Sequence, residues 1–474
     1  MSEVLSYDNL QVSPYRITQL QELSIVKKVN DHTRLRLTGI VPEELTDRYV
    51  KMTEADTNIE IKQVNDESQS TPLFAGVVQH IEVKAIRGVY YIEIEAISHT
   101  YKLDMKRRTR SFQNAKMTYA ALLETIIADY PWVDFMDIAS GGSCIGAFTL
   151  QYQETDWEFL QRMASRLSTG LVAASVFDKP KFYFGIPDGS VKGALEDYNY
   201  RVKKNLSNYR TSYENGRLGV DESDFIFYEV ETNKVMELGN EITFKGRSLH
   251  VCEIHTEMRN SIVKHVYTLC PRQGLYQNIR YNNKIAGISL QGEVISLTAG
   301  KVKVHLDMDP EQKIGGAHWF PYSSIYTAEG STGWYCMPEL GDHVMIYFPS
   351  MKEEEGIAIS SVRKDTKESR TNKVSDPNIK YFRTASGKEL MFSPEEIVIT
   401  GKDGEVYIRL HDIEGIEIVS KKPIRLKSDE DIVMDSQKSV IIRAEKELKM
   451  QCKDSVIKML EGSTVIRGKD VKTN

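Results

Sequence analysis

The feature that most constrains the fold is an apolar pair that returns every eight residues near the C-terminus. An α-helix turns by about 100° per residue, so this spacing would move the pair around the helix by roughly 80° each time. In a β-strand, residues i and i+2 lie on one face. The repeat therefore predicts short strands separated by turns. The paired residues are Ile408 and Leu410, Ile416 and Ile418, Ile424 and Leu426, Ile432 and Met434, Val440 and Ile442, and Leu448 and Met450.

A strand that buries only two side chains needs neighbours to complete a core. A single-chain β-helix repeats about every 20 residues, whereas three chains that each give one eight-residue unit per layer would supply three faces. The pattern therefore predicts an intertwined homotrimer, whose cyclic symmetry also pairs the strand edges. A flat meander or a single-chain solenoid is the alternative. The register is expected to weaken at Lys458, which takes an inner position.

A small β-barrel is expected upstream of the repeat. The segment from 285 to 365 contains the runs EVISL, KVKVHL and HVMIYF, punctuated by Gly and Pro. In GWYCMPELGDHVMIYF, a turn with Pro338, Gly341 and Asp342 leads into a strand. This turn resembles that of the oligomer-binding (OB) fold barrel of VgrG and phage-tail spike proteins. The order of barrel and then octad repeat is also similar to the spike of that family.

The N-terminal portion, up to about residue 284, contains short alternating segments such as RLRLTGIV and YYIEIEAI, which predict strands. Two segments, LFAGVVQHIEV and TFKGRSLHVCEI, resemble each other weakly and lie on either side of a helical stretch. This similarity favours a duplicated barrel, and chance similarity is the alternative. The aligned residues are Phe74 with Phe244, Gly76 with Gly246, and His80 with His250.

Two helices are expected between these segments. The first spans about 117–128, where apolar residues recur at helical spacing. The second lies in QYQETDWEFLQRMASRLSTG, whose carboxylates could suggest an acid and a base. However, Thr155 and Glu158 have the spacing of a capping box, and acidic residues in a first turn are favoured by the helix dipole. We therefore expect a structural helix cap, with Gly170 ending the helix. The carboxylates are Glu154, Asp156 and Glu158.

The second helix also resembles a helix in the hub region of the VgrG family. The matching residues are Tyr152, Glu154, Thr155, Asp156, Trp157, Phe159, Leu160 and Arg162. The expected fold is mainly β, with two β-barrel hub domains, a helical α/β insert, an OB-fold barrel and a C-terminal intertwined trimeric β-helix. The expected domains are hub barrel 1 (1–100), the α/β insert (101–190), hub barrel 2 (191–284), the OB-fold barrel (285–365), a linker with collar strands (366–404) and the octad-repeat spike (405–474).

The resemblance implies a mechanical function. The chain would be the homotrimeric hub and spike of a contractile injection system, such as a phage tail, a tail-like bacteriocin or a type VI-like apparatus. The hub would dock onto a hexameric tail-tube protein among baseplate proteins, and contraction of a sheath would drive the rod through a target-cell envelope. The end of the rod could carry a small metal-containing tip protein of the PAAR-like type or a cargo effector.

Composition narrows the partners and the compartment. The formal net charge of −6 gives no overall positive field for nucleic acid, and the KRRTR run at 106–110 is expected to be a solvated loop. The five scattered cysteines favour a reducing cytoplasm. The N-terminus lacks the charged and apolar regions of a signal peptide, which predicts cytoplasmic assembly and delivery as part of a tail-like particle.

Motifs for chemistry are not found. The sequence contains no P-loop, no Gly-x-Ser-x-Gly and no His-Glu-x-x-His. His250 and Cys252 would share one face of a strand while His255 lies on the other, so they are not expected to meet at one ion. We therefore expect no catalytic residue, no metal and no cofactor. The alternatives are a spike that degrades peptidoglycan and a trimeric receptor-binding tail fibre.

Overall fold

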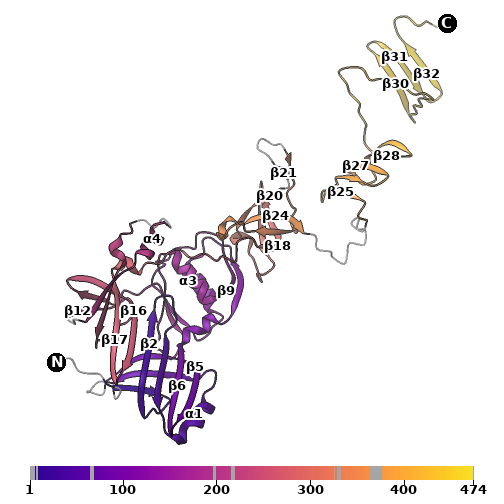
Figure 1. Ribbon diagram of the computed structural model, residues 1–474. Coiled ribbons are helices and arrows are strands. Elements are labelled where there is room, and N and C mark those ends of the chain that lie inside the picture. The colour runs from indigo at the N-terminus through magenta and orange to yellow at the C-terminus, as the bar shows by residue number, and fades with distance from the viewer. Residues whose placement is uncertain are drawn as a thin grey trace. The chain divides into compact units, whose positions relative to one another are not determined.

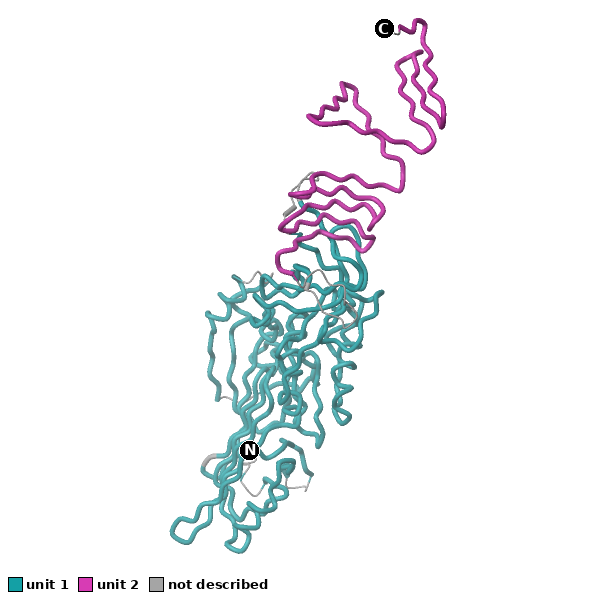
Figure 2. The backbone as a smooth tube through the Cα atoms, turned by 90° about the vertical axis from the view of Figure 1, so that its right-hand side faces the viewer, with its two compact units in different colours: residues 1–366 teal, residues 367–474 magenta. Residues whose placement is uncertain are grey.

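The computed structural model divides the chain into two compact units, 1–366 and 367–474, which are coloured separately in Figure 2. The structure describes residues 6, 9–64, 69–195, 199–214, 219–324, 326–327, 333–362 and 376–472. Residues 366–375 of the predicted linker lie outside the described residues. The mainly β class predicted from the sequence is confirmed.

The part of the first unit up to Cys270 is built on one twelve-stranded sheet (Figure 1). Its main path runs β1-β4-β5-β6-β3-β2-β16-β17-β14-β13, and β15 and β12 branch from β16. The strands are β1 (Leu10–Ser13), β2 (Gln19–Lys28), β3 (Arg34–Ile40), β4 (Asn58–Val64), β5 (Ser70–Ile86), β6 (Val89–Ser98), β12 (Val191–Ala194), β13 (Tyr200–Lys204), β14 (Ile226–Thr232), β15 (Glu241–Phe244), β16 (Arg247–Arg259) and β17 (Ile262–Cys270). Two helices accompany them, α1 (Thr46–Met52) and α4 (Leu206–Glu214).

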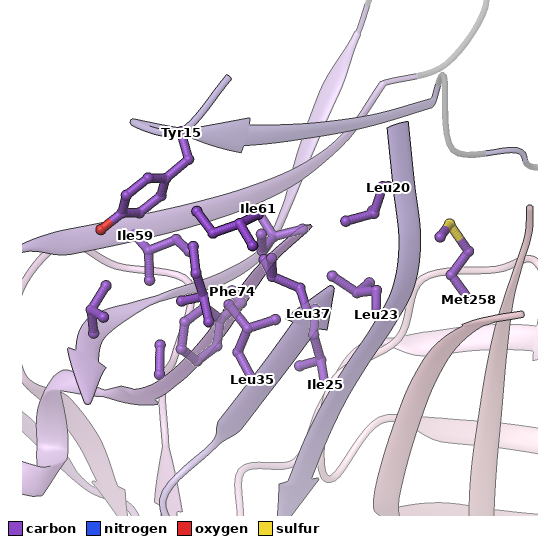
Figure 3. Close-up of a cluster of buried hydrophobic side chains, with 14 of the residues drawn as sticks. Tyr15, Leu20, Leu23, Ile25, Leu35, Leu37, Ile59, Ile61, Phe74 and Met258 are labelled. Carbon is purple, nitrogen blue, oxygen red and sulfur yellow. The ribbon is translucent and has the colours of Figure 1, made fainter. Parts of the chain in front are cut away.

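This sheet has two hydrophobic cores. The first gathers side chains from β2 to β6 around Phe74, Leu37 and Ile61 (Figure 3). The second gathers side chains from the segment 230–275, including Phe244 and Tyr267. The two halves are continuous, because β2 pairs antiparallel with β16. This pairing removes a free edge from each half.

The weak internal similarity does not mark equivalent backbone positions. Phe74 and Phe244 are both buried, each in one of the two cores. Gly76, however, lies inside β5, where a Cβ atom would meet the carbonyl oxygen of Ile97. Gly246 has φ +71° in the turn between β15 and β16, and its surroundings are open. The two glycines therefore serve different needs, close strand packing and a turn.

The insert lies in the sequence between the two groups of strands that form this sheet, and it has its own hydrophobic core. Its helices are α2 (Tyr119–Ile127) and α3 (Asp156–Arg166), and it also contains the 3₁₀ helix η3 (His99–Asp104). Trp157, Leu160 and Phe182 are among its buried residues. The strands are β7 (Arg107–Phe112) paired with β9 (Thr149–Thr155), and β8 (Asp134–Asp137), β10 (Leu171–Ala173) and β11 (Lys181–Phe184) in a three-stranded sheet.

The prediction of a solvated loop at residues 106–110 is wrong. Residues 107–112 form strand β7. The side chains of Arg108 and Arg110 are largely buried and pair with Asp156, whose side chain is fully buried. The basic run therefore supplies counter-ions to a buried carboxylate, which composition alone does not reveal.

A closed five-stranded barrel completes the first unit, with strand order β18-β19-β20-β24-β23. Its core includes Val304, Phe320 and Ile346, and also Phe148 and Leu150 from the insert. A short hairpin, β21 (Tyr326–Thr327) and β22 (Gly333–Trp334), accompanies it. The barrel strands are β18 (Ser289–Thr298), β19 (Lys301–Leu306), β20 (Trp319–Ser323), β23 (His343–Tyr347) and β24 (Ile357–Val362), and the 3₁₀ helix η7 (Glu353–Glu355) precedes β24.

The second unit contains two open antiparallel sheets. The strands of the first are β25 (Lys380–Arg383), β26 (Glu389–Phe392), β27 (Glu396–Lys402), β28 (Val406–His411) and β29 (Gly415–Ser420), and those of the second are β30 (Glu447–Cys452), β31 (Ser455–Leu460) and β32 (Ser463–Arg467). The sequence predicts strands throughout the repeat, but residues 421–446 form none in the single chain. A strand requires a pairing partner, and this segment has none within its own chain.

Candidate functional site

The octad repeat presents an uncovered apolar surface. In the sheet β25–β29, Ile408 pairs with Ile418 and Leu410 pairs with Ile416, so the predicted pairs share one face. These side chains are exposed, and Ile416 reaches 74%. We call the set of paired residues from Ile408 to Met450 the octad face. Beyond this sheet its members Ile424, Leu426, Ile432, Met434, Val440 and Ile442 are also exposed.

The opposite face of the same sheet is polar. Arg409 makes ion pairs with Glu396 and Glu414, and Tyr407 donates to Glu417. Arg409 and Glu417 are paired across the strands, as the alternation of side chains requires. The sheet therefore has one face of paired charged and polar side chains and one face of uncovered aliphatic side chains. That asymmetry is typical of a surface that a further layer covers.

The register of the repeat changes after Met450. A two-residue turn at Lys453 and Asp454 joins β30 to β31 and pairs Met450 with Ile457. Lys458 instead pairs with Lys449 on the other face and forms an ion pair with Glu447. The inner position predicted for Lys458 is therefore wrong. The tight turn moves the apolar face onto Ile457 and Met459, so the charge is not buried.

The capping residues of α3 lie where the spacing predicts them. Thr155 Oγ1 accepts from the backbone N–H of Glu158 at 3.1 Å, and the Glu158 carboxylate accepts from the N–H of Thr155 at 2.9 Å. The other carboxylates are also engaged. Asp156 binds Arg108, Arg110 and Tyr130, and Glu154 binds Arg162. Ion pairing and capping account for all three groups. The carboxylates are Glu154, Asp156 and Glu158.

The end of α3 differs from the prediction. Ser168, with φ +55°, supplies the left-handed residue that closes the helix, and its N–H donates to the carbonyl of Ser165. Gly170 lies beyond it. A Cβ atom at Gly170 would come within 2.6 Å of Val29 and 2.7 Å of Asn30, so glycine permits close approach of the insert to the turn after β2.

A buried ion cluster joins α3 to the barrel, and sequence reasoning missed it. Arg162 donates to Glu353 at 2.9 Å and to Glu154 at 2.8 Å, and Arg166 also donates to Glu353. Glu353 is 2% exposed. Burial by itself lowers the pKa of Arg162, and the charges of Glu353 and Glu154 overcome this effect and raise it. The run EEE at 353–355 carries no sequence signal for burial.

Further contacts connect strand β7 and the residues after it to the barrel. The N–H of Ser111 donates to the Asp309 carboxylate at 2.9 Å. Gln113 donates to the carbonyl of Val304 and accepts from the N–H of His318. Burial raises the pKa of Asp309. With Phe148 and Leu150 in the barrel core, these contacts make the insert and the barrel one packed body.

The predicted barrel turn leads into β23. The N–H of Asp342 donates to the carbonyl of Glu339, and Gly341 has φ +86° at the third position of this turn. Gly341 also donates its N–H to Val294, which ties the turn to β18. A left-handed residue at this point explains the glycine. Pro338 comes directly before the turn, where it ends the preceding segment.

Two histidines of β16 and β17 make side-chain contacts of their own. Within the described ranges, no three His, Cys, Asp or Glu residues are close enough to hold an ion. His255 contacts Ser24, and His265 contacts Thr256 and Gln63. All five cysteines are free thiols. The helices of the described residues include none long and apolar enough to span a membrane.

One segment of the chain is similar to a known protein family. Residues 34–168 match the family model described as the phage tail baseplate hub (GPD). This range includes the capping box and Arg162 of α3. The comparison with curated proteins found no match.

Solved structures show the same fold over most of the chain. One is the E. coli c3393 protein, described as a component of the type VI secretion system with structural similarity to T4 bacteriophage tail proteins gp27 and gp5. It is 14% identical, with a TM-score of 0.51, covering 75% of this chain and 99% of that chain. Another is the half-lidded PdpA–VgrG complex of Francisella, 8% identical with a TM-score of 0.55, covering 84% of this chain and 83% of that chain. Residues 34–168 thus resemble the phage tail baseplate hub family, and the chain has the fold of VgrG-type hub proteins, which confirms the resemblance predicted from its sequence.

Proposed function

We propose that this chain is the homotrimeric central hub and envelope-piercing spike at the baseplate of a contractile injection system. The observation that carries the proposal is the uncovered octad face. Apolar side chains at strand spacing remain exposed from Ile408 to Ile442 and again at Met450, and monomeric proteins rarely expose so long an apolar surface. Two further copies of the chain would cover it.

The energetics favour assembly of the repeat. Burying one aliphatic side chain of this size contributes about 1.5–3 kcal/mol. Each layer of a trimer would bury six such side chains, two from each chain. Residues 421–446 also carry backbone groups without strand partners, and neighbouring chains would pair them. These two gains would offset the entropy lost when the extended segment becomes ordered.

The first unit supplies the hub. Its insert and barrel share a core and a buried ion cluster, so force on the barrel would pass to the hub without bending a flexible joint. We infer that the hub docks onto a hexameric tail tube among other baseplate proteins. Work would come from contraction of a sheath, and the rod would only need to resist unfolding.

The end of the chain offers a place for a tip or a cargo. The sheet β30–β32 presents Ile457 and Ile466 on one face beyond the octad face, and both are exposed. A PAAR-like tip protein or an effector could cover this face. The Francisella structure is a complex of VgrG with PdpA, and this partner is described for the Francisella protein alone.

We infer that the protein has no enzymatic role. The three carboxylates near α3 are held by arginines and by the helix cap, an arrangement that suits a structural function. Zymography on bacterial cell wall tests this inference. A clear lytic band from the purified protein would contradict it and would favour a peptidoglycan-degrading spike.

Light scattering coupled to size-exclusion chromatography tests the trimer. A homotrimer should elute with three times the chain mass of 54.1 kDa. Electron microscopy of the same fraction should show a rod continuing from a wider body. A stable monomer at micromolar concentration would refute the proposal, and a rod that ends in a separate folded head would favour a tail fibre.

A further inference from the structure

The apolar surface of the sheet β25–β29 extends upstream of the octad face. The two isoleucines of β27 pair with octad-face residues of β28. On their other side, the same isoleucines pair with the leucine and the phenylalanine of β26. Directly opposite residues of antiparallel strands share a face, so one apolar surface runs from β26 to β29. We call its four upstream residues the collar face, and they are Leu390, Phe392, Ile397 and Ile399.

Burial in this sheet is the reverse of what a single chain in water favours. On the collar face, Phe392 is 44% exposed and Ile399 is 48% exposed. On the opposite face, Glu389 pairs across the strands with Thr400, and these residues are 6% and 9% exposed. Arg383 forms an ion pair with Glu389 there. Charged residues are usually outside and large apolar residues inside, so the collar face requires a cover from outside the chain.

Continuity with the octad face indicates what this cover is. The collar face and the octad face are parts of one surface on one sheet. A layer that covered the octad face and stopped at β28 would leave the apolar side of β26 and β27 open. Two further copies of the chain, the occupants proposed for the octad face, therefore also fit the collar face. This step rests on the proposed function.

The spacing of the collar face differs from that of the octads. Its apolar pairs begin seven residues apart, from Leu390 to Ile397, and the next pair begins eleven residues later, at Ile408. If one chain moved by eight residues along the rod, each octad would meet another aliphatic pair of similar size, an exchange that cores tolerate. The same movement would put Leu390 in the place of Val398, which lies on the opposite face. The collar face therefore matches its copies in one alignment only.

We propose that the collar face packs against the collar faces of two further copies and sets the axial alignment of the three chains. Its strands already pair within one chain, whereas residues 421–446 form none. A preformed surface loses less conformational entropy when it binds than an extended segment does. Phe392 adds a ring that the positions of the octads, which hold smaller aliphatic side chains, accommodate only with strain. The octads then extend the rod from chains that are already aligned.

Thiol labelling of the full-length protein tests the packing. In a background without the exposed cysteines (Cys144→Ser, Cys336→Ser, Cys452→Ser), Ile399→Cys places a thiol on the collar face. This thiol should react with a maleimide at least about tenfold more slowly in the trimer than in a monomer made by Ile416→Asp and Ile418→Asp. The control is Lys402→Cys at an exposed position near the end of β27, which should react equally in both forms.

Two results of this experiment are distinguishable. Equal labelling of Ile399→Cys in trimer and monomer would overturn the packing of the collar face and would leave the octad trimer standing. A wild type that is a monomer by light scattering would instead refute the proposed function, and the role of the collar face with it.

Electron cryomicroscopy of the trimer, refined without imposed symmetry, tests the alignment. In the variant Phe392→Ala, Ile399→Ala we expect a class of particles with one chain displaced along the rod by one layer of strands, about 4.8 Å. The matched control Ile424→Ala, Leu426→Ala removes apolar bulk from the octads and should keep the three chains at one height, as the wild type should. Chains at one height in both variants would overturn the aligning role. Dissociation of the first variant into monomers would also overturn it, because the octads would then not hold the chains together.

Discussion

Arg162 and Glu353 form a buried ion pair between positions 191 residues apart in the sequence, with Nη1 of Arg162 donating to Oε2 of Glu353 at 2.9 Å. Arg162 belongs to α3 of the insert, and Glu353 belongs to η7 beside the barrel. Arg166 contacts the second oxygen of Glu353. The pair therefore joins the insert to the barrel, whose core also receives Phe148 and Leu150 of the insert.

Replacing this carboxylate should destabilise the first unit. Glu353→Gln removes a charge that faces two arginines, and breaking a buried pair costs about 3–5 kcal/mol. Because Glu154 still neutralises Arg162 in part, we expect a loss near the lower end of this range. Urea unfolding followed by tryptophan fluorescence measures it. The control is Glu354→Gln at the exposed neighbouring position, which should change stability by less than about 0.5 kcal/mol.

The ion cluster could not be predicted from the sequence for a physical reason. Local spacing identifies a helix cap, since Thr155 and Glu158 meet within one turn. The partner of Arg162, in contrast, is selected by the tertiary packing of the barrel against α3. Glu353 stands in a run of three glutamates whose composition is typical of a solvated loop, and only burial distinguishes it from its neighbours.

His265 should make stability depend on pH. Burial, with a smaller effect of the charge of Lys27, lowers the pKa of His265 to about 4. In the unfolded chain this pKa is about 6.5, so below that pH the unfolded state binds a proton that the folded state does not. The contribution of His265 to the free energy of unfolding is therefore complete above pH 6.5. It is lost as the pH falls toward 4, and the loss is at most about 3 kcal/mol.

Unfolding at pH 7.5 and pH 4.5 measures this contribution. The wild type should lose more stability between these values than His265→Asn does, by about 2–3 kcal/mol. The control is His80→Asn at an exposed position, which should retain the pH dependence of the wild type. An equal loss in the wild type and the His265→Asn variant would show that His265 does not carry the effect.

Charges on the octad face should prevent assembly. In the double variant Ile416→Asp, Ile418→Asp, the trimer layer that contains these positions would bury six like charges without partners, which is strongly unfavourable. We expect the mass by light scattering to fall from three chains to one, with unchanged circular dichroism of the first unit. The control is Glu417→Gln, because Glu417 lies between the two positions in the sequence and its side chain is on the polar face. A trimer that survives the double substitution would place its contacts elsewhere.

The repeat shows how far a periodic pattern can predict structure. The spacing of Ile408 and Leu410 predicts that the two side chains share one face. In the structure they pair with Ile418 and Ile416 of the neighbouring strand on that same face. A single chain pairs its strands only where a turn returns the backbone at once, as at residues 412–414 and 453–454. The strands predicted between these turns need pairing partners that do not belong to the same chain. The sequence of one chain can therefore predict the uncovered face but cannot show what covers it.

Gly341 should be intolerant of a side chain for conformational reasons alone. Its φ of +86° is left-handed, and no atom lies within 4 Å of the position a Cβ would take. Gly341→Ala should therefore destabilise the barrel by about 1–2 kcal/mol through backbone strain without a clash. Gly315→Ala is the control, because it has equally open surroundings and no positive φ, and it should be neutral or slightly stabilising. Equal unfolding midpoints for the two variants in urea would show that the turn before β23 adapts to a right-handed residue.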